Sequence, residues 1–179
     1  MSEIEIRPAI SSDINQLILF EHSVSTNTIW QMDRGMDEHQ VNISFRQTHL
    51  PRPIRLAYPR KPEKLKDDWQ KKAVVYIATM GDQPVGYLNI IMQPANPFAW
   101  VTDLVVDDPY RRKGIACELL LAGREWAGER NLQRIVLEMH LKNHPASCLA
   151  QKMGFQFCGY NDHYYENQVI ALFFGYSLR

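Results

Sequence analysis

The sequence places three cationic side chains directly before Gly114, at the predicted start of a helix: Arg111, Arg112 and Lys113. A glycine there lets a ligand approach the first free backbone N–H groups of the helix, and these donors and the helix dipole attract anions, phosphate above all. The two arginines could also hold phosphate in bidentate contacts, and Ala116 keeps the first turn small. The spacing is neither that of a P-loop nor that of G-x-G-x-x-G. Taken alone, the stretch therefore fits a phosphate site or a solvated charge cluster.

The elements that must position this corner are strands with a few helices between them. Apolar and β-branched runs predict strands near residues 3–8, 73–80, 85–94, 98–106, 134–141, 155–160 and 168–179. Helical patterns cover residues 11–22, about 114–130 and 144–154. The helix over 114–130 lies between two apolar strands, which favours a parallel pair.

The segment from about 25 to 72 is harder to interpret. It carries many charges and has prolines at positions 51, 53, 59 and 62. We expect short helices and irregular loops here, with a solvated loop favoured over a basic patch.

Length and composition narrow the class of protein. The chain has 179 residues, and we expect one domain over 1–179. Equal numbers of acidic and basic residues, 20 each, argue against a dedicated nucleic-acid partner. The sequence shows neither a signal peptide nor a bilayer-spanning stretch, so we expect a cytoplasmic protein with no membrane partner. The three cysteines and six histidines have no metal-ligand spacing, so we predict no metal.

Two motifs in the second half resemble those of the GCN5-related N-acetyltransferases (GNAT). In "LVVDDPYRRKGIACELL" the pattern R/Q-x-x-G-x-G/A follows an apolar strand and opens a helix. Its matching positions are Arg111, Gly114 and Ala116. In "NHPASCLAQKMGF" the N-x-x-A…K-x-G-F pattern matches at Asn143, Ala146, Lys152, Gly154 and Phe155. The resemblance runs from about Val74 to Phe155, and the "LEM…N" segment and the tail are also similar to streptothricin acetyltransferases.

The resemblance implies a fold and a co-substrate. The fold class would be α+β, a mixed, twisted central sheet of about six or seven strands flanked by helices. Acetyl-coenzyme A would place its pyrophosphate on the backbone N–H groups of Arg112, Lys113, Gly114, Ile115 and Ala116. Its pantetheine arm would pair with the main chain of Leu104, Val105 and Val106, and Asn143 would bind the arm near the thiol. The strands over 98–106 and 134–140 would splay apart around the thioester, with a backbone N–H near Leu104 stabilising the oxyanion.

One position departs from the family. A tyrosine four residues before the G-F pair often protonates the leaving thiolate, and Ala150 stands there in this chain. A different hydroxyl could replace it, with Ser147, Tyr160, Tyr164 and Tyr165 as candidates. The thiolate could also leave unprotonated, or the chain could be a binding protein without catalysis. We take Tyr164 as the predicted donor.

Candidates for the base flank the expected splay. Asp103 is either functional or a strand-end residue that bonds backbone groups. Glu138 sits mid-strand in an apolar run, where an unpaired carboxylate is costly, so function or a specific ion pair is expected. His140 shares its face, but a surface or satisfied histidine is the commoner outcome. In the tail, Tyr164, Tyr165 and Glu166 suit a cationic amine or form a half-buried hairpin face.

The function that the resemblance implies is acetyl-coenzyme A-dependent N-acetylation of a primary amine, with a small-molecule substrate favoured. Two alternatives remain open at the level of sequence. One is a protein N-terminal or lysine acetyltransferase of the same fold, which would act on a peptide. The other is a non-catalytic acetyl-coenzyme A-binding regulatory module. We expect a monomer or a homodimer.

Overall fold

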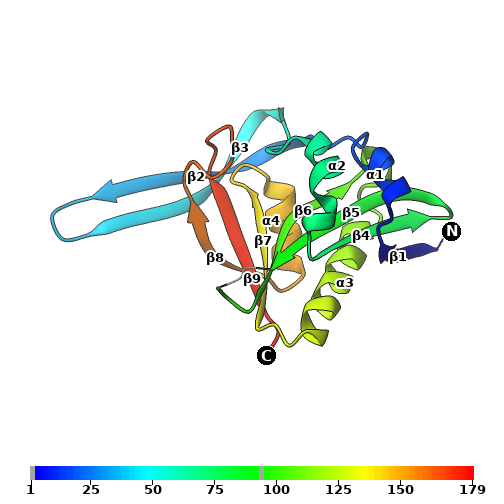
Figure 1. The fold of residues 1–179 in the computed structure, drawn as a ribbon. Coiled ribbons are helices and arrows are strands. Elements are labelled where there is room, and N and C mark those ends of the chain that lie inside the picture. The colour runs from blue at the N-terminus through cyan, green and yellow to red at the C-terminus, as the bar shows by residue number, and fades with distance from the viewer. Residues whose placement is uncertain (1–2, 93–94) are drawn as a thin grey trace.

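The computed structural model describes residues 3–92 and 95–179 as a seven-stranded mixed sheet with flanking helices and a separate hairpin (Figure 1). The sheet order is β1-β4-β5-β6-β7-β9-β8. Its strands are β1 (Ile4–Pro8), β4 (Val74–Met80), β5 (Gln83–Met92), β6 (Phe98–Val106), β7 (Arg134–His140), β8 (Gln156–Asn161) and β9 (Ala171–Ser177). The pair β6–β7 is parallel, and the other neighbouring pairs in the sheet are antiparallel. This confirms the predicted fold class. Residues 93–94, which the sequence assigns to the end of a strand, lie outside the described residues.

The helices cover both faces of the sheet. They are α1 (Ser11–Leu17), α2 (Leu65–Asp68), α3 (Ile115–Glu129) and α4 (His144–Lys152), and short 3-10 turns cover Pro62–Lys64, Trp69–Lys71 and Asp108–Tyr110. On β5, Leu88 belongs to the larger hydrophobic cluster, which holds residues of α3 and α4, and Tyr87 belongs to the smaller one, which holds residues of α1 and α2. Because neighbouring side chains of a strand point to opposite faces, the two helix pairs lie on opposite sides of the sheet.

The ends of α3 and α4 carry residues that suit helix caps, and the predicted start of α3 at Gly114 is confirmed. Gly114 is the N-cap of α3 with a φ of +86°, a left-handed conformation that glycine adopts without strain. Asn131 follows the last turn with a φ of +55°, as expected of a C-terminal cap. At α4, the Asn143 side chain accepts a hydrogen bond from the Ala146 N–H at 3.2 Å. Within the described ranges, no helix has the length and apolarity needed to span a membrane.

The expectation of irregular structure across 25–72 is wrong for its larger part. Strands β2 (Val24–Met36) and β3 (Val41–Leu56) form a long antiparallel hairpin that extends away from the sheet (Figure 1). The prolines misled the prediction because they fall where the ladder is interrupted. Thr26 pairs with Ile54 and Thr28 with His49, so Pro51 and Pro53 lie in the irregularity between these pairs. Proline is tolerated there because no ladder hydrogen bond is required of it.

Candidate active site

The candidate site begins where two parallel strands part. Strands β6 and β7 pair from Phe98 opposite Arg134 to Val101 opposite Leu137, and the pairing ends there. Strand β6 continues to Val106 with β5 as its partner. Its other edge is therefore open beyond Val101, which is the splay that the resemblance implied.

A β-bulge at Thr102 decides which side chains face each side of β6. Opposite β5, Ile90 pairs with Val101 and Asn89 with Asp103, so Thr102 is the extra residue. Val101 packs in the cluster beneath α3, whereas Val105 packs in the cluster beneath α1 and α2. Strict alternation would have put both on one face. The bulge therefore turns Asp103 toward the α1 and α2 side.

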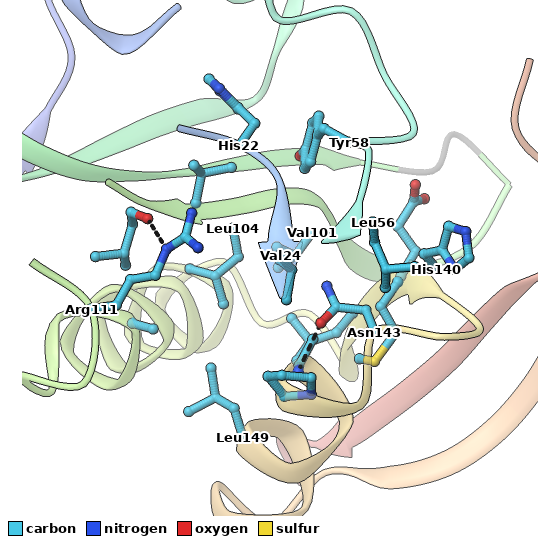
Figure 2. A pocket seen from close by; sticks show the side chains of 18 of the residues that line it. His22, Val24, Leu56, Tyr58, Val101, Leu104, Arg111, His140, Asn143 and Leu149 are labelled. Carbon is cyan, nitrogen blue, oxygen red and sulfur yellow. Dashed lines mark hydrogen bonds between the residues drawn. The ribbon is translucent and has the colours of Figure 1, made fainter. Parts of the chain in front are cut away.

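A cavity of about 530 Å³ runs along this gap (Figure 2). One end lies at the corner before α3, and its wall includes Arg111, Arg112, Gly114, Ile115, Ala116 and Cys117. The middle is formed by the parting strands and by the start of α4, with Leu104, Val105, Val106, Leu137 and Asn143. The other end, called the acceptor end below, has His22, Tyr58, Arg60, Glu138, His140 and Tyr165 in its wall. In Figure 2, Arg111 and Asn143 lie on opposite sides of the cavity, and His22 and Tyr58 lie above it.

The corner offers a run of backbone donors. No described residue accepts a hydrogen bond from the N–H groups of residues 112–116, whereas the next two, of Cys117 and Glu118, donate to the Gly114 carbonyl. Arg112 and Gly114 both have left-handed backbone conformations, with φ of +65° and +86°. Left-handed residues among helical ones turn successive N–H groups toward one side and form an anion-binding concavity. The corner can therefore hold a phosphate through its main chain.

The neighbouring arginines of the corner differ in what their side chains do. The Arg111 guanidinium donates to the carbonyls of Val106 and Ser23, each at 2.9 Å, and to that of Glu21. Three of its five N–H donors are therefore engaged within the protein, and the side chain anchors the corner to the residues before β2. A bidentate phosphate contact by Arg111 stays a prediction. The Arg112 side chain is exposed and stays free to meet an anion.

At the acceptor end, Glu138 is fully paired. Its buried carboxylate accepts hydrogen bonds from Arg60, from the Trp100 indole at 2.5 Å and from the Tyr164 hydroxyl at 2.7 Å. The Arg60 guanidinium also donates to the Thr102 carbonyl at 2.9 Å. Arg60 thus bridges β6 and β7 where they part. The sequence predicted either a functional carboxylate or a specific ion pair at Glu138, and the structure shows the ion pair with Arg60.

Asp103 has a different environment. It is 7% exposed and lies within β6 rather than at a strand end bonded to backbone groups. Its carboxylate accepts from the Tyr58 hydroxyl, from Asn89 Nδ2 at 3.0 Å and from Thr102 Oγ1 at 2.9 Å. All three donors are neutral, so this carboxylate is solvated by dipoles and not by a cation.

Of the four hydroxyls considered as thiolate donors, Tyr165 lines the cavity and the other three do not. Ser147 is buried, donates to the His144 carbonyl at 2.8 Å and accepts from the Trp30 indole at 2.9 Å. Tyr160 packs against Phe45 of the hairpin, and the Tyr164 hydroxyl is bound to Glu138. Ala150 is fully buried in the larger cluster, where an added ring would overpack the core.

Burial lowers the pKa of both histidines in the cavity wall, which favours their neutral forms. Burial lowers the pKa of His22, whose Nδ1 donates to the Phe20 carbonyl at 2.7 Å and whose Nε2 accepts from the Tyr87 hydroxyl at 2.9 Å. Burial, and to a lesser extent Lys142, lower the pKa of His140 to about 4. In the part of the chain that the structure describes, no group of three His, Cys, Asp or Glu residues is placed to hold a metal.

Sequence reasoning missed Tyr58, Arg60 and His22. All three come from the N-terminal third, where neither hydrophobic periodicity nor a motif marks them. Arg60 and Tyr58 are revealed only by their pairing with Glu138 and Asp103, 78 and 45 residues away along the chain. His22 is revealed by its place in the cavity wall.

Comparisons with known proteins agree with this geometry. Residues 43–155 match the model of the Acetyltransferase (GNAT) family. The chain is similar to the streptothricin acetyltransferase of Streptomyces lavendulae, with 24% identity over 171 residues that cover 92% of this chain and 88% of that protein. Its fold is similar to the crystal structure of nourseothricin acetyltransferase, with a TM-score of 0.84, 20% identity, and 98% and 99% of the two chains covered. A Bacillus anthracis protein in complex with acetyl coenzyme A is similar with a TM-score of 0.75, 20% identity and 98% of each chain covered.

Proposed function

The chain belongs to the GNAT family of N-acetyltransferases, and from that premise we propose that it transfers the acetyl group of acetyl-coenzyme A to a primary amine of a small cationic molecule. One observation carries the proposal. A single cavity connects the free backbone N–H groups before α3, the open edge of β6 and an acceptor end whose wall includes Glu138 and Tyr58, with Asp103 bonded to the Tyr58 hydroxyl. A co-substrate with a diphosphate, an extended arm and a reactive thioester fits this sequence of features.

The cofactor half of the proposal rests mainly on backbone groups. The N–H groups of residues 112–116 would bind the pyrophosphate, aided by the charges of Arg112 and Lys113. The open edge of β6 at Leu104, Val105 and Val106 would pair with the pantetheine arm. The N–H near Leu104 would bind the thioester oxygen and stabilise the oxyanion that forms as the amine attacks. Asn143 lines the middle of the cavity, and its side-chain amide can reach the arm near the thiol.

The acceptor half favours a cation. The charged groups at this end are two buried carboxylates, Asp103 and Glu138, and the partly exposed guanidinium of Arg60. An ammonium group that enters would balance the remaining negative charge, and burial strengthens this attraction. Residues 56–60 and Tyr165 contribute walls to this end, and we take a small molecule rather than an extended peptide as the acceptor. The similarity to streptothricin acetyltransferase supports the same class of acceptor.

The thiolate can leave in either of two ways. Tyr165, which lines the cavity, is the hydroxyl best placed to protonate it, in place of the predicted Tyr164. Otherwise the thiolate of coenzyme A leaves unprotonated and takes a proton from solvent. The single domain over 1–179, the cytoplasmic location and the choice between monomer and homodimer stay predictions.

The test is thiol release from acetyl-coenzyme A, measured with streptothricin and, in parallel, with a peptide that offers a free N-terminus and a lysine. We expect streptothricin-dependent release and an acetylated antibiotic by mass spectrometry. Release with the peptide alone would replace the proposed acceptor by a protein. Tight binding of acetyl-coenzyme A without release in either reaction would favour the non-catalytic module.

A further inference from the structure

We propose that Tyr58 is the catalytic residue that accepts the proton of the attacking amine and passes its own hydroxyl proton to Asp103. The inference rests on the proposed amine acetylation and adds a proton relay to it. The Tyr58 ring forms part of the cavity wall, whereas Asp103 does not line the cavity. The hydroxyl of Tyr58 donates to Asp103 Oδ1. Tyr58 therefore connects the acceptor end with a carboxylate that the cavity does not reach directly.

The surroundings of Asp103 fix the position of its carboxylate beside Tyr58. Asn89 and Thr102 donate to its other oxygen, Oδ2. The Asn89 Oδ1 atom is buried and has no hydrogen-bond partner among the described residues. An unpaired buried acceptor costs about 1–3 kcal/mol, yet the opposite orientation of the amide would turn this oxygen toward the carboxylate. Asn89 thus holds the Asp103 carboxylate in place, although its own side-chain oxygen is left without a hydrogen bond.

Other titratable groups at the acceptor end are less suited to the task. The three donors of Glu138 include the cation Arg60, and its carboxylate holds the bridge between β6 and β7. Both ring nitrogens of His22 are already bonded. His140, with a pKa of about 4, is too weak a base to take a proton from an amine at neutral pH.

The relay moves one proton at each link. The bound ammonium group first passes one proton to the Tyr58 oxygen while the Tyr58 proton passes to Asp103, which leaves a neutral amine. The amine nitrogen then bonds to the thioester carbon, and the C–S bond breaks with its electron pair leaving on sulfur. The second proton lost by the nitrogen goes to the thiolate through solvent, and Asp103 returns its proton to solvent. Burial and the nearby Asp103 raise the pKa of Tyr58 well above its usual value. The hydroxyl therefore keeps its proton until it receives another, as a relay requires.

The experiment compares Tyr58→Phe, Asp103→Asn and their combination with the wild type, using streptothricin as the acceptor. Loss of a general base lowers turnover by about 100-fold or more, and we expect this for each single variant at pH 7, with acetyl-coenzyme A affinity unchanged by calorimetry. Because both residues serve one relay, the double variant should be no slower than the singles. The deficit should shrink as pH rises, since more of the amine is then neutral before it binds. The groups that face Tyr58 are His22, Tyr87 of β5, Asp103 of β6 and Arg60, and the Phe variant leaves all four in place.

Tyr87→Phe is the matched control. It removes a hydroxyl from the same buried cluster, but that hydroxyl bonds to His22 and does not line the cavity, so turnover should stay within about twofold of wild type. A Tyr58→Phe variant as active as this control would overturn the relay. So would single losses that multiply in the double variant.

A second measurement keeps the relay separate from the choice of acceptor. Slow hydrolysis of acetyl-coenzyme A without any amine also requires a proton to leave the attacking water. Tyr58→Phe should reduce this hydrolysis, and Tyr87→Phe should not. If wild type fails to acetylate streptothricin but its hydrolysis depends on Tyr58, the proposed acceptor is wrong and the relay stands. If hydrolysis is the same in both variants and wild type, the relay is wrong.

Discussion

The corner before α3 and the acceptor end belong to one cavity but are built in different ways. The corner consists of consecutive residues, and its binding groups are main-chain N–H donors held by local backbone conformation. The acceptor end consists of side chains from distant segments, in which Arg60 holds Glu138 and Tyr58 holds Asp103. Ligand affinity at the backbone site should therefore change when the backbone conformation changes. The stability of the side-chain cluster should instead change when a single partner is lost.

The largest effect is expected at Arg60. Arg60→Met removes the cation between the two parting strands and leaves the buried Glu138 carboxylate without a counter-charge. Breaking a buried ion pair in this way costs about 3–5 kcal/mol. We expect the lower end of this range because the Arg60 side chain is 32% exposed. Urea unfolding measures the loss, and acetylation should fall with it.

The control for Arg60 removes both charges. Arg60→Met combined with Glu138→Gln leaves no unpaired buried charge, so it should recover part of the stability but not the activity. A double variant less stable than Arg60→Met alone would show that the pair is not what holds the acceptor end.

The two adjacent arginines of the corner, Arg111 and Arg112, are expected to affect different properties. Arg111→Gln loses charge-assisted hydrogen bonds to three carbonyls and should destabilise the fold by about 2 kcal/mol. Arg112→Gln should leave stability within about 0.5 kcal/mol of wild type and weaken acetyl-coenzyme A binding, most at low salt. Thermal unfolding and calorimetry on both variants check this. Equal stability losses would remove the distinction between the arginines.

Gly114 tests the backbone character of the corner. Gly114→Val forces a β-branched residue into a left-handed conformation at about 1–2 kcal/mol and places a side chain against the exposed N–H groups. Acetyl-coenzyme A affinity should fall about tenfold or more, as measured by calorimetry.

Gly81→Val separates strain from binding. Gly81 also has a left-handed φ, +61°, and open space around an added Cβ, but it lies in the turn between β4 and β5 and does not line this cavity. A similar stability loss with unchanged affinity is expected. A loss of affinity in the Gly81 variant would trace the Gly114 effect to general destabilisation.

The smallest effect concerns pH and the acceptor end. The folded pKa of His140, about 4, lies below its ordinary value, so the unfolded chain binds the proton more tightly. The stability contributed by neutral His140 is complete above about pH 6.5 and is lost as pH falls toward 4. Because the side chain is partly exposed, we expect about 1 kcal/mol. His140→Gln should flatten the unfolding free energy between pH 6.5 and 4 relative to wild type, and parallel curves would contradict the assignment.

Local sequence determined the corner and most of the elements. Gly114 predicted the start of α3, which the structure confirms, because a cap depends on residues within one turn of it. The strands from β4 onward were predicted from hydrophobic runs, because such a run is a pattern of neighbouring residues. The hairpin over β2 and β3 did not, since its prolines resemble a break until the partner strand shows where the ladder is interrupted.

Tertiary structure alone decided the acceptor end. The bulge at Thr102 exists only in the pairing of β6 with β5, and it turns Asp103 away from the face that alternation with Val101 predicts. Arg60 meets Glu138 only because the chain after β3 returns across the gap between β6 and β7. Bonds between residues this far apart leave no periodic pattern and no fixed spacing in a single sequence. The backbone site could therefore be predicted from the order of the residues, whereas the side-chain cluster required the fold.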